Sequence, residues 1–292
     1  MIRKLKYHEI DFSKYTSCLE SSEQTNWYAR KEVLDELCEQ WEVLIYGDYK
    51  AVMPIPLKKK LGFKFAVMPL FCQQLGIFSQ KENKESNDLF LEYFQKKYTI
   101  FQYSFNYHNQ FSDGLDTKRN YIIPVSNYDL LRKTYFKGRK STVKSAQHLS
   151  YKEITFDQCI VAFIELNSKG LSKSKDLLKF KKYIEALDQM SVLKLCGAFL
   201  EDQLISLAVL ICDNKELSLL ALVNDENFKN ENGASYLIDK ILKEYIHEFS
   251  FNFMGSNIRN IEVFFKSFGG QLREFASLEN RNIIKFRKLI KT

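Results

Sequence analysis

Long apolar runs, paired cysteines and glycine-rich stretches are what this 292-residue sequence has least of. Its longest apolar run, Leu204–Cys212, has the length of a buried strand and falls well short of the roughly 20 residues that cross a bilayer as a helix. The start of the chain is basic, but the apolar segment of a secretion signal does not follow it. These absences lead us to expect a soluble, cytoplasmic protein with no transmembrane segment.

The cysteines give no sign of a metal site or a redox motif. All six stand singly, and most have apolar neighbours, among which a free cysteine acts as a small hydrophobic side chain. A Ser/His/Asp order and a Walker phosphate loop are also missing. We therefore expect no metal and name no catalytic residue. What the chain does have is 45% hydrophobic and 27% charged residues, which is typical of a globular protein with substantial cores.

The net charge of +7 favours an anionic partner. A CoA pyrophosphate, a nucleotide-sugar, RNA and a membrane surface all satisfy this condition. Ordinary solvated lysines explain the same surplus, so charge alone selects none of them, and the oligomeric state is not indicated at all.

The informative feature is an order of elements that occurs twice. In the first half, apolar runs of strand length alternate with turns, which predicts an antiparallel meander over 42–46, 49–57 and 63–68. Pro54 and Pro56 indicate that its middle strand lies at a sheet edge or bends. A helix over 87–97 and a strand over 100–105 follow.

The second half repeats that order with a meander over 192–200, 204–212 and 216–223, a polar loop, a helix over 233–247 and a strand over 249–254. On this last helix, Asp239 and Lys243 have the spacing of an exposed ion pair. Between the two halves, the pattern predicts a strand over 119–125 and helices over 128–148, 160–166 and 177–187.

The repeated pattern predicts an α/β protein of the α+β type with two tandem domains. Each domain is a mainly antiparallel meander sheet flanked by helices. The polar stretch Asp113–Thr117 marks the boundary, which gives an N-terminal domain over 1–118 and a C-terminal domain over 119–292. The two halves share the pattern without evident identity of residues.

Three segments carry a resemblance to known families. The segment 251–257, an apolar helix and then Phe265-Lys266-Ser267-Phe268-Gly269-Gly270 resemble the Fem family of peptidyl-bridge transferases and tandem GNAT proteins. Residues 47–54 and 73–76 are similar to the same group. The resemblance implies two domains of the GNAT N-acyltransferase fold. The sequence departs from the pattern at Asn252, where Asp is usual, and at Met254, where Glu is usual.

The resemblance also implies a phosphate site at the start of the helix that opens at Gly233. GNAT enzymes hold the CoA pyrophosphate in a glycine-rich turn at this place, because a helix N-terminus offers unpaired N–H groups and a positive dipole end. The residues that we expect to bind acyl-CoA or acetyl-CoA there are Lys229, Asn232, Gly233, Ala234 and Ser235. An ordinary junction between a loop and a helix is the alternative.

Substrate-binding residues are expected in two other segments. A basic helix resembles one that lies near the substrate channel in the Fem family and contributes Arg139, Lys140 and Lys144. A solvated helix face is the alternative interpretation. The turn after the Phe-rich strand contributes Gly255, Ser256 and Asn257.

Three functions fit this sequence. The first is an N-acyltransferase that moves an acyl group from acyl-CoA to an amine, on a small molecule or a cell-envelope acceptor, by direct attack without a covalent enzyme intermediate. The second is a Fem-like aminoacyl transferase that uses aminoacyl-tRNA and so needs an RNA-binding surface. The third is a catalytically degenerate binding protein of the GNAT fold, which Asn252 and Met254 favour.

Overall fold

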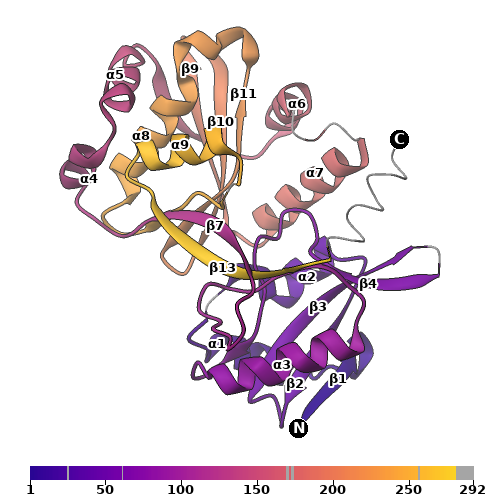
Figure 1. Ribbon diagram of the computed structural model, residues 1–292. Coiled ribbons are helices and arrows are strands. Elements are labelled where there is room, and N and C mark those ends of the chain that lie inside the picture. Colours follow the sequence, from indigo (N-terminus) through magenta and orange to yellow (C-terminus); the bar gives the residue numbers. More distant parts are fainter. Residues whose placement is uncertain (25, 61, 169–170, 172–173, 256, 281–292) are drawn as a thin grey trace. The chain divides into compact units, whose positions relative to one another are not determined.

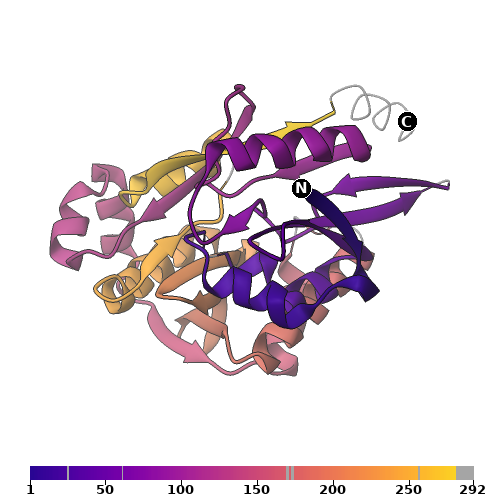
Figure 2. The same cartoon turned by 90° about the horizontal axis from the view of Figure 1, so that it is seen from below.

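The computed structural model describes residues 1–24, 26–60, 62–168, 171, 174–255 and 257–280 (Figures 1 and 2). The chain divides into two compact units. The first unit comprises Met1–Lys118 together with the chain from Glu274 onward, and the second unit comprises Arg119–Arg273. Among the described residues, no helix combines the length and the apolarity needed to cross a membrane.

The sheet of the first unit has the strand order β1-β2-β3-β4-β6-β13. Strands β1 to β4 form an antiparallel meander, β6 is parallel to β4, and β13 is antiparallel to β6. The bounds are β1 Ile2–Lys6, β2 Gln40–Tyr46, β3 Ala51–Lys60, β4 Phe63–Val67, β6 Ile100–Ser104 and β13 Gln271–Glu279, and the short β5 Phe78–Ser79 pairs with β3.

Two α-helices of the first unit, α1 and α3, begin at side-chain caps. The side chain of Asp11 accepts a hydrogen bond from the Lys14 N–H at the start of α1, and Asn83 does the same for Ser86 at the start of α3. The helices are α1 Phe12–Glu20, α2 Lys31–Leu37 and α3 Lys84–Lys97, with short 3-10 turns η1 Tyr7–Glu9 and η2 Trp27–Ala29. The elements that precede β2 were not predicted from the sequence.

The prolines of β3 lie in an interior strand, not at the edge of the sheet. However, β3 pairs with β4 only from Leu57 onward and with β5 only at Ala51 and Val52, so one side of the stretch between them is open. The Pro54 carbonyl on that side accepts a hydrogen bond from the Tyr103 hydroxyl at 2.9 Å. Because the N–H and C=O of one strand residue project to the same side, the missing proline N–H removes no ladder hydrogen bond.

The sheet of the second unit has the strand order β8-β9-β10-β11-β12-β7. Its strands are β7 Asp116–Ile123, β8 Ser150–Ile154, β9 Leu193–Leu200, β10 Gln203–Asp213, β11 Glu216–Asn224 and β12 Ser250–Asn252. Its helices are α4 Tyr128–Thr134, α5 Lys137–Ser145, α6 Gln158–Asn167, α7 Ser174–Gln189, α8 Gly233–Tyr245 and α9 Arg259–Ser267, and the 3-10 segment η3 Glu226–Glu231 precedes α8.

The strands of the two units have the same order and the same directions. The meander β8 to β11 corresponds to β1 to β4, β12 lies parallel to β11 as β6 does to β4, and the sixth strand is antiparallel in both. The sixth strands come from different parts of the chain, because β7 precedes its meander and β13 follows α9. The segment 274–280, which the sequence analysis assigned to the C-terminal domain, therefore belongs to the first unit, where Ser277 pairs with Ser104.

The basic segment 128–148 was expected to be one helix and is two, α4 and α5. Tyr135 and Phe136 between them have extended ψ angles of 139° and 147°. The ring of Tyr135 is buried edge-on against Phe268, with centroids 5.2 Å apart, and the Phe136 N–H donates to the Ser267 carbonyl at 3.1 Å. Packing against α9 therefore ends α4, where local propensity alone would continue the helix.

Candidate functional site

The parallel strands β11 and β12 of the second unit stay paired over only three residues. The pairs run from Glu216 and Ser250 to Ser218 and Asn252, after which β12 ends and β11 continues to Asn224. Within β11, the register with β10 skips Leu220, which is a β-bulge. Beyond Ser218, β11 therefore runs without β12 at its side as it approaches η3 and α8.

Arg139 and Ser235, which the sequence analysis placed in two separate groups, are brought together. Ser235 lies in the first turn of α8, and its hydroxyl accepts a hydrogen bond from a terminal nitrogen of the Arg139 guanidinium. The Arg139 Nε donates to the Ser267 hydroxyl of α9 at 2.8 Å. The guanidinium also lies over two rings of α9, 4.4 Å from the centroid of Phe264 and 4.6 Å from that of Phe268.

The positive charge of Arg139 is not balanced by a carboxylate among its described contacts. Partial burial lowers the pKa of its guanidinium, because removal from water disfavours the charged form. The described contacts of this side chain are with hydroxyls and rings and include no carboxylate. The first turn of α8 contains no acidic residue either. A cation is thus held at the positive end of a 13-residue helix, an arrangement that an anion would stabilise. We call Arg139, Ser235 and Ser267 the guanidinium cluster.

The other predicted cations do not join this cluster. Lys140 donates to the backbone carbonyl of Lys133 at 2.9 Å, and Lys144 and Lys229 are exposed. Asn232 adopts the left-handed conformation, with φ of 61°, between η3 and α8, and Ala234 follows Gly233 in the first turn. The predicted cofactor-binding residues are therefore neighbours along the chain, but among the described residues only Ser235 contacts a predicted substrate-binding residue.

Gly233 packs against the sheet. A Cβ atom at this position would collide with the Oγ of Ser206 in β10 and would lie 3.2 Å from the Cδ1 of Ile205. Ser206 in turn donates to the side-chain oxygen of Asn224 at 2.7 Å. Close packing of α8 on β10 thus explains glycine at this position without a ligand, whereas the sequence led us to expect Gly233 in a CoA site.

The turn after β12 has a left-handed backbone at Met254 and Gly255, with φ of 60° and 69°. The side chain of Asn252 organises it, because its Oδ1 accepts from the Met254 N–H and its Nδ2 donates to Glu216, both at 2.8 Å. Asn257 accepts from the Arg119 N–H at 3.4 Å. Ser256, which we expected to bind substrate, lies outside the described residues.

A charged cluster that the sequence analysis missed surrounds Glu262 of α9. One oxygen of this carboxylate, Oε1, accepts from the hydroxyl of Tyr121 and lies 3.0 Å from Arg119 NH1 and 3.5 Å from Lys266 Nζ. The Tyr121 hydrogen bond, and then the charges of Lys266 and Arg119, hold the pKa of Glu262 below its usual range. Only the spacing of Glu262 and Lys266 is visible in the sequence, since Tyr121 is distant along the chain.

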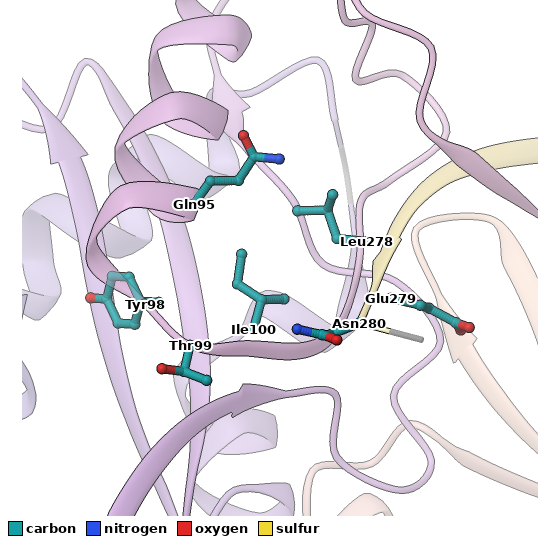
Figure 3. Close-up of a pocket in the computed structure, with 7 residues that line it drawn as sticks. All are labelled: Gln95, Tyr98, Thr99, Ile100, Leu278, Glu279 and Asn280. Carbon is teal, nitrogen blue, oxygen red and sulfur yellow. The ribbon is translucent and has the colours of Figure 1, made fainter. Parts of the chain in front are cut away.

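Two cavities lie in the first unit. One, of about 460 Å³, has Gln95 of α3, Ile100 of β6 and Leu278 of β13 in its wall (Figure 3). The other, of about 500 Å³, contains Trp41 and Glu42 of β2. Both carboxylates Glu42 and Glu279 are already paired with lysines. Across the described residues, no group of three or more His, Cys, Asp or Glu side chains is placed to hold a metal ion.

Comparison with solved structures identifies the fold. A crystal structure of FemX aligns with a TM-score of 0.66 and 12% identity, over 99% of this chain and all of that one. The C-terminal domain of a putative lysylphosphatidylglycerol synthetase from Agrobacterium fabrum aligns with a TM-score of 0.54 and 11% identity, over 96% and 94%. A tandem GNAT protein from the clavulanic acid biosynthesis pathway gives 0.51 and 10%, over 95% and 97%.

The chain therefore has a tandem GNAT-like, Fem-related fold, as the sequence analysis predicted. These identities are low enough that the likeness shows the fold alone. No protein-family model matches the sequence, and no curated protein matches it either.

Proposed function

We propose that the second unit transfers an acyl group from acyl-CoA to an amine. The reaction is a direct attack of the amine nitrogen on the thioester carbonyl. The new C–N bond replaces the C–S bond, the thiolate of CoA leaves, and the amine proton passes to water or a base. The tandem GNAT protein with the same fold supports this reaction class. A small molecule or a cell-envelope amine is the acceptor.

The observation that carries this proposal is the guanidinium cluster at the first turn of α8. A diphosphate placed there would accept hydrogen bonds from α8 N–H groups and from Arg139. It would neutralise both the Arg139 charge and the positive end of the α8 dipole. The hydroxyls of Ser235 and Ser267 and the rings of Phe264 and Phe268 fix the orientation of Arg139. The Arg139 guanidinium is thus oriented before the ligand binds, which lowers the entropic cost of binding.

The strand β11 supports the chemical step. Its bulge at Leu220 and the end of β12 at Asn252 leave backbone groups of β11 outside the regular ladder. A backbone N–H in such a position can donate to the oxyanion that forms when the amine attacks. We assign no base among the described residues.

The test is a calorimetric titration of the full chain with CoA and acetyl-CoA. Because a hydrogen bond to a charged group contributes about 1.5–3 kcal/mol, we expect Arg139→Gln to weaken binding about 10- to 100-fold. The matched control is Lys144→Gln, which removes one exposed charge from the same helix, α5, and should change the affinity less than twofold. Absence of CoA binding by the wild-type chain would overturn the proposal.

Aminoacyl-tRNA is the second candidate donor. The likeness to FemX and to a lysylphosphatidylglycerol synthetase favours it, and so does Gly233, whose packing role removes one reason to expect a CoA turn. Tight tRNA binding that falls steeply with salt and is lost in the Arg139, Lys140 and Lys144 triple Gln variant would establish this candidate. Binding of CoA without turnover on any amine would indicate the degenerate binding protein.

A further inference from the structure

The hairpin of β3 and β4 extends beyond the sheet of the first unit. The last pair between β2 and β3 is Gln40 with Leu57, and the first pair between β4 and β6 is Ala66 with Ile100. The pairs from Lys58 with Phe65 to Lys60 with Phe63 therefore form a two-stranded ribbon with no further strand on either side (Figure 1). We call the described side chains of this ribbon, Lys58, Lys59, Phe63, Lys64 and Phe65, the basic arm.

The basic arm combines a surplus of positive charge with an exposed ring. Lys59 and Lys64 are direct cross-strand partners, so two like charges face each other, which is unfavourable in a folded hairpin. Lys58 lies 3.0 Å from Glu39 and Lys64 lies 3.6 Å from Glu42, whereas Lys59 has no ion pair within the described part of the chain. Phe63, in the last described pair of the ribbon, is 70% exposed.

Protection of a sheet edge explains only part of this arm. Lysines on an exposed edge discourage pairing with other chains, and that role accounts for Lys58 and Lys59. It does not account for Phe63, because an exposed ring on an unpaired ribbon promotes the association that lysines prevent. The combination requires a partner that takes up both an apolar side chain and positive charge.

We propose that the basic arm docks the protein on an anionic phospholipid surface. In this arrangement Phe63 enters the boundary between headgroups and acyl chains, and the long Lys59 side chain extends to the lipid phosphates. Lys58 exchanges its exposed partner Glu39 for a lipid phosphate. Single-stranded RNA is a poorer match, because it is bound in basic grooves with several stacking rings, and the described arm exposes one ring fully.

The experiment is co-sedimentation of the full chain with vesicles of phosphatidylglycerol and phosphatidylcholine in equal parts, compared with pure phosphatidylcholine. We expect partition onto the anionic vesicles that weakens with added salt. A lysine near an anionic surface contributes about fivefold in partition, so the variant with Lys58→Gln and Lys59→Gln should lose about 25-fold. Phe63→Ser should lose about tenfold or more, because a buried aromatic ring is removed.

Matched controls separate the arm from general charge and apolarity. Lys96→Gln with Lys97→Gln removes two exposed lysines of α3 in the same unit, and Leu166→Ser removes a side chain that is 84% exposed in the second unit. Both should partition as the wild type does, and all variants should keep the wild-type melting temperature. Equal partition of the arm variants and the wild type would overturn the proposal. So would retention of poly(U) RNA by the wild type without vesicle binding, or equal losses in the controls.

A negative result in the vesicle experiment would not affect the proposed CoA site. The arm lies in the first unit and the guanidinium cluster in the second, so CoA titrations should be unchanged in the arm variants.

Discussion

At the scale of single residues, the candidate site of the second unit depends on contacts between side chains that are far apart in the sequence. Arg139 and Ser235 were both recognisable as candidates, one from a basic helix and one from a helix start. Their contact, and the participation of Ser267, depend on how α5, α8 and α9 pack. The Glu262 cluster is similar, because its members come from two elements that are distant along the chain, β7 and α9. Residue type therefore indicated the chemistry, and packing selected the partners.

Gly233 allows the packing explanation to be tested against the ligand explanation. Alanine normally stabilises a helix relative to glycine by about 1 kcal/mol. Here we expect Gly233→Ala to destabilise the protein by about 1–3 kcal/mol in urea unfolding, because the new methyl group meets Ser206 and Ile205. In a Ser206→Ala background, the penalty should shrink because the colliding hydroxyl is gone. A stable Gly233→Ala protein that has lost CoA binding would favour the ligand explanation instead.

At the scale of elements, the buried carboxylate of Asp239 links α8 to α4. Asp239 was expected to form an exposed pair with Lys243, but its side chain is buried and its residue is 2% exposed. It accepts from the Tyr128 hydroxyl at 2.9 Å, and Arg132 NH1 lies 3.7 Å away. Arg132 also donates to Tyr128 at 2.8 Å. Part of the basic segment thus serves packing between helices and is unavailable to a polyanion.

This contact predicts an asymmetry between the two residues of the expected pair. Asp239→Ala should lower the free energy of unfolding by about 2 kcal/mol, since Arg132 and the Tyr128 hydroxyl lose a buried partner. Lys243→Ala should change it by less than about 0.5 kcal/mol, as an exposed substitution does. A double-mutant cycle with Tyr128→Phe should give a coupling of about 1 kcal/mol. Equal effects of the two alanine variants would contradict the contact.

At the scale of the whole molecule, the two units obtain their sixth strands from opposite directions along the chain. The first unit is completed by β13, which contains the buried Phe275, and β6 lacks its antiparallel neighbour without it. The second unit contains β7 from Arg119 onward, with Ile122 and Ile123 paired to β12.

Fragments of the chain should therefore differ in stability. We expect a fragment over 119–273 to melt cooperatively, because it contains six strands of its own sheet. A fragment over 1–118 should be destabilised by about 3 kcal/mol or more and tend to aggregate, since it loses the burial of Phe275 and exposes the edge of β6. Fusion of residues 271–280 to it through a flexible linker should restore stability. Calorimetry of the three fragments tests this, and a fully stable 1–118 fragment would contradict it.

The sequence by itself determined the local pattern of this protein. Alternation of apolar runs with turns located three strands of each meander, β2 to β4 and β9 to β11, but neither β1 nor β8. Helical periodicity located α3, α6, α7 and α8 to within a few residues. Gly269 follows α9 in the left-handed conformation, with φ of 84°, which glycine adopts readily because it has no Cβ atom. Turn chemistry and periodicity act over a few residues, so a sequence displays them directly.

Only the tertiary structure decided the long-range features. It ended α4 at Tyr135, because the ring of Tyr135 packs against Phe268, and it assigned β13 to the first unit through hydrogen bonds to β6. It also buried Asp239, closed the space beside Gly233 and held Arg139 at the first turn of α8. Each of these depends on free energy gained between residues far apart in the chain, and spacing in the sequence does not encode which distant surfaces will meet.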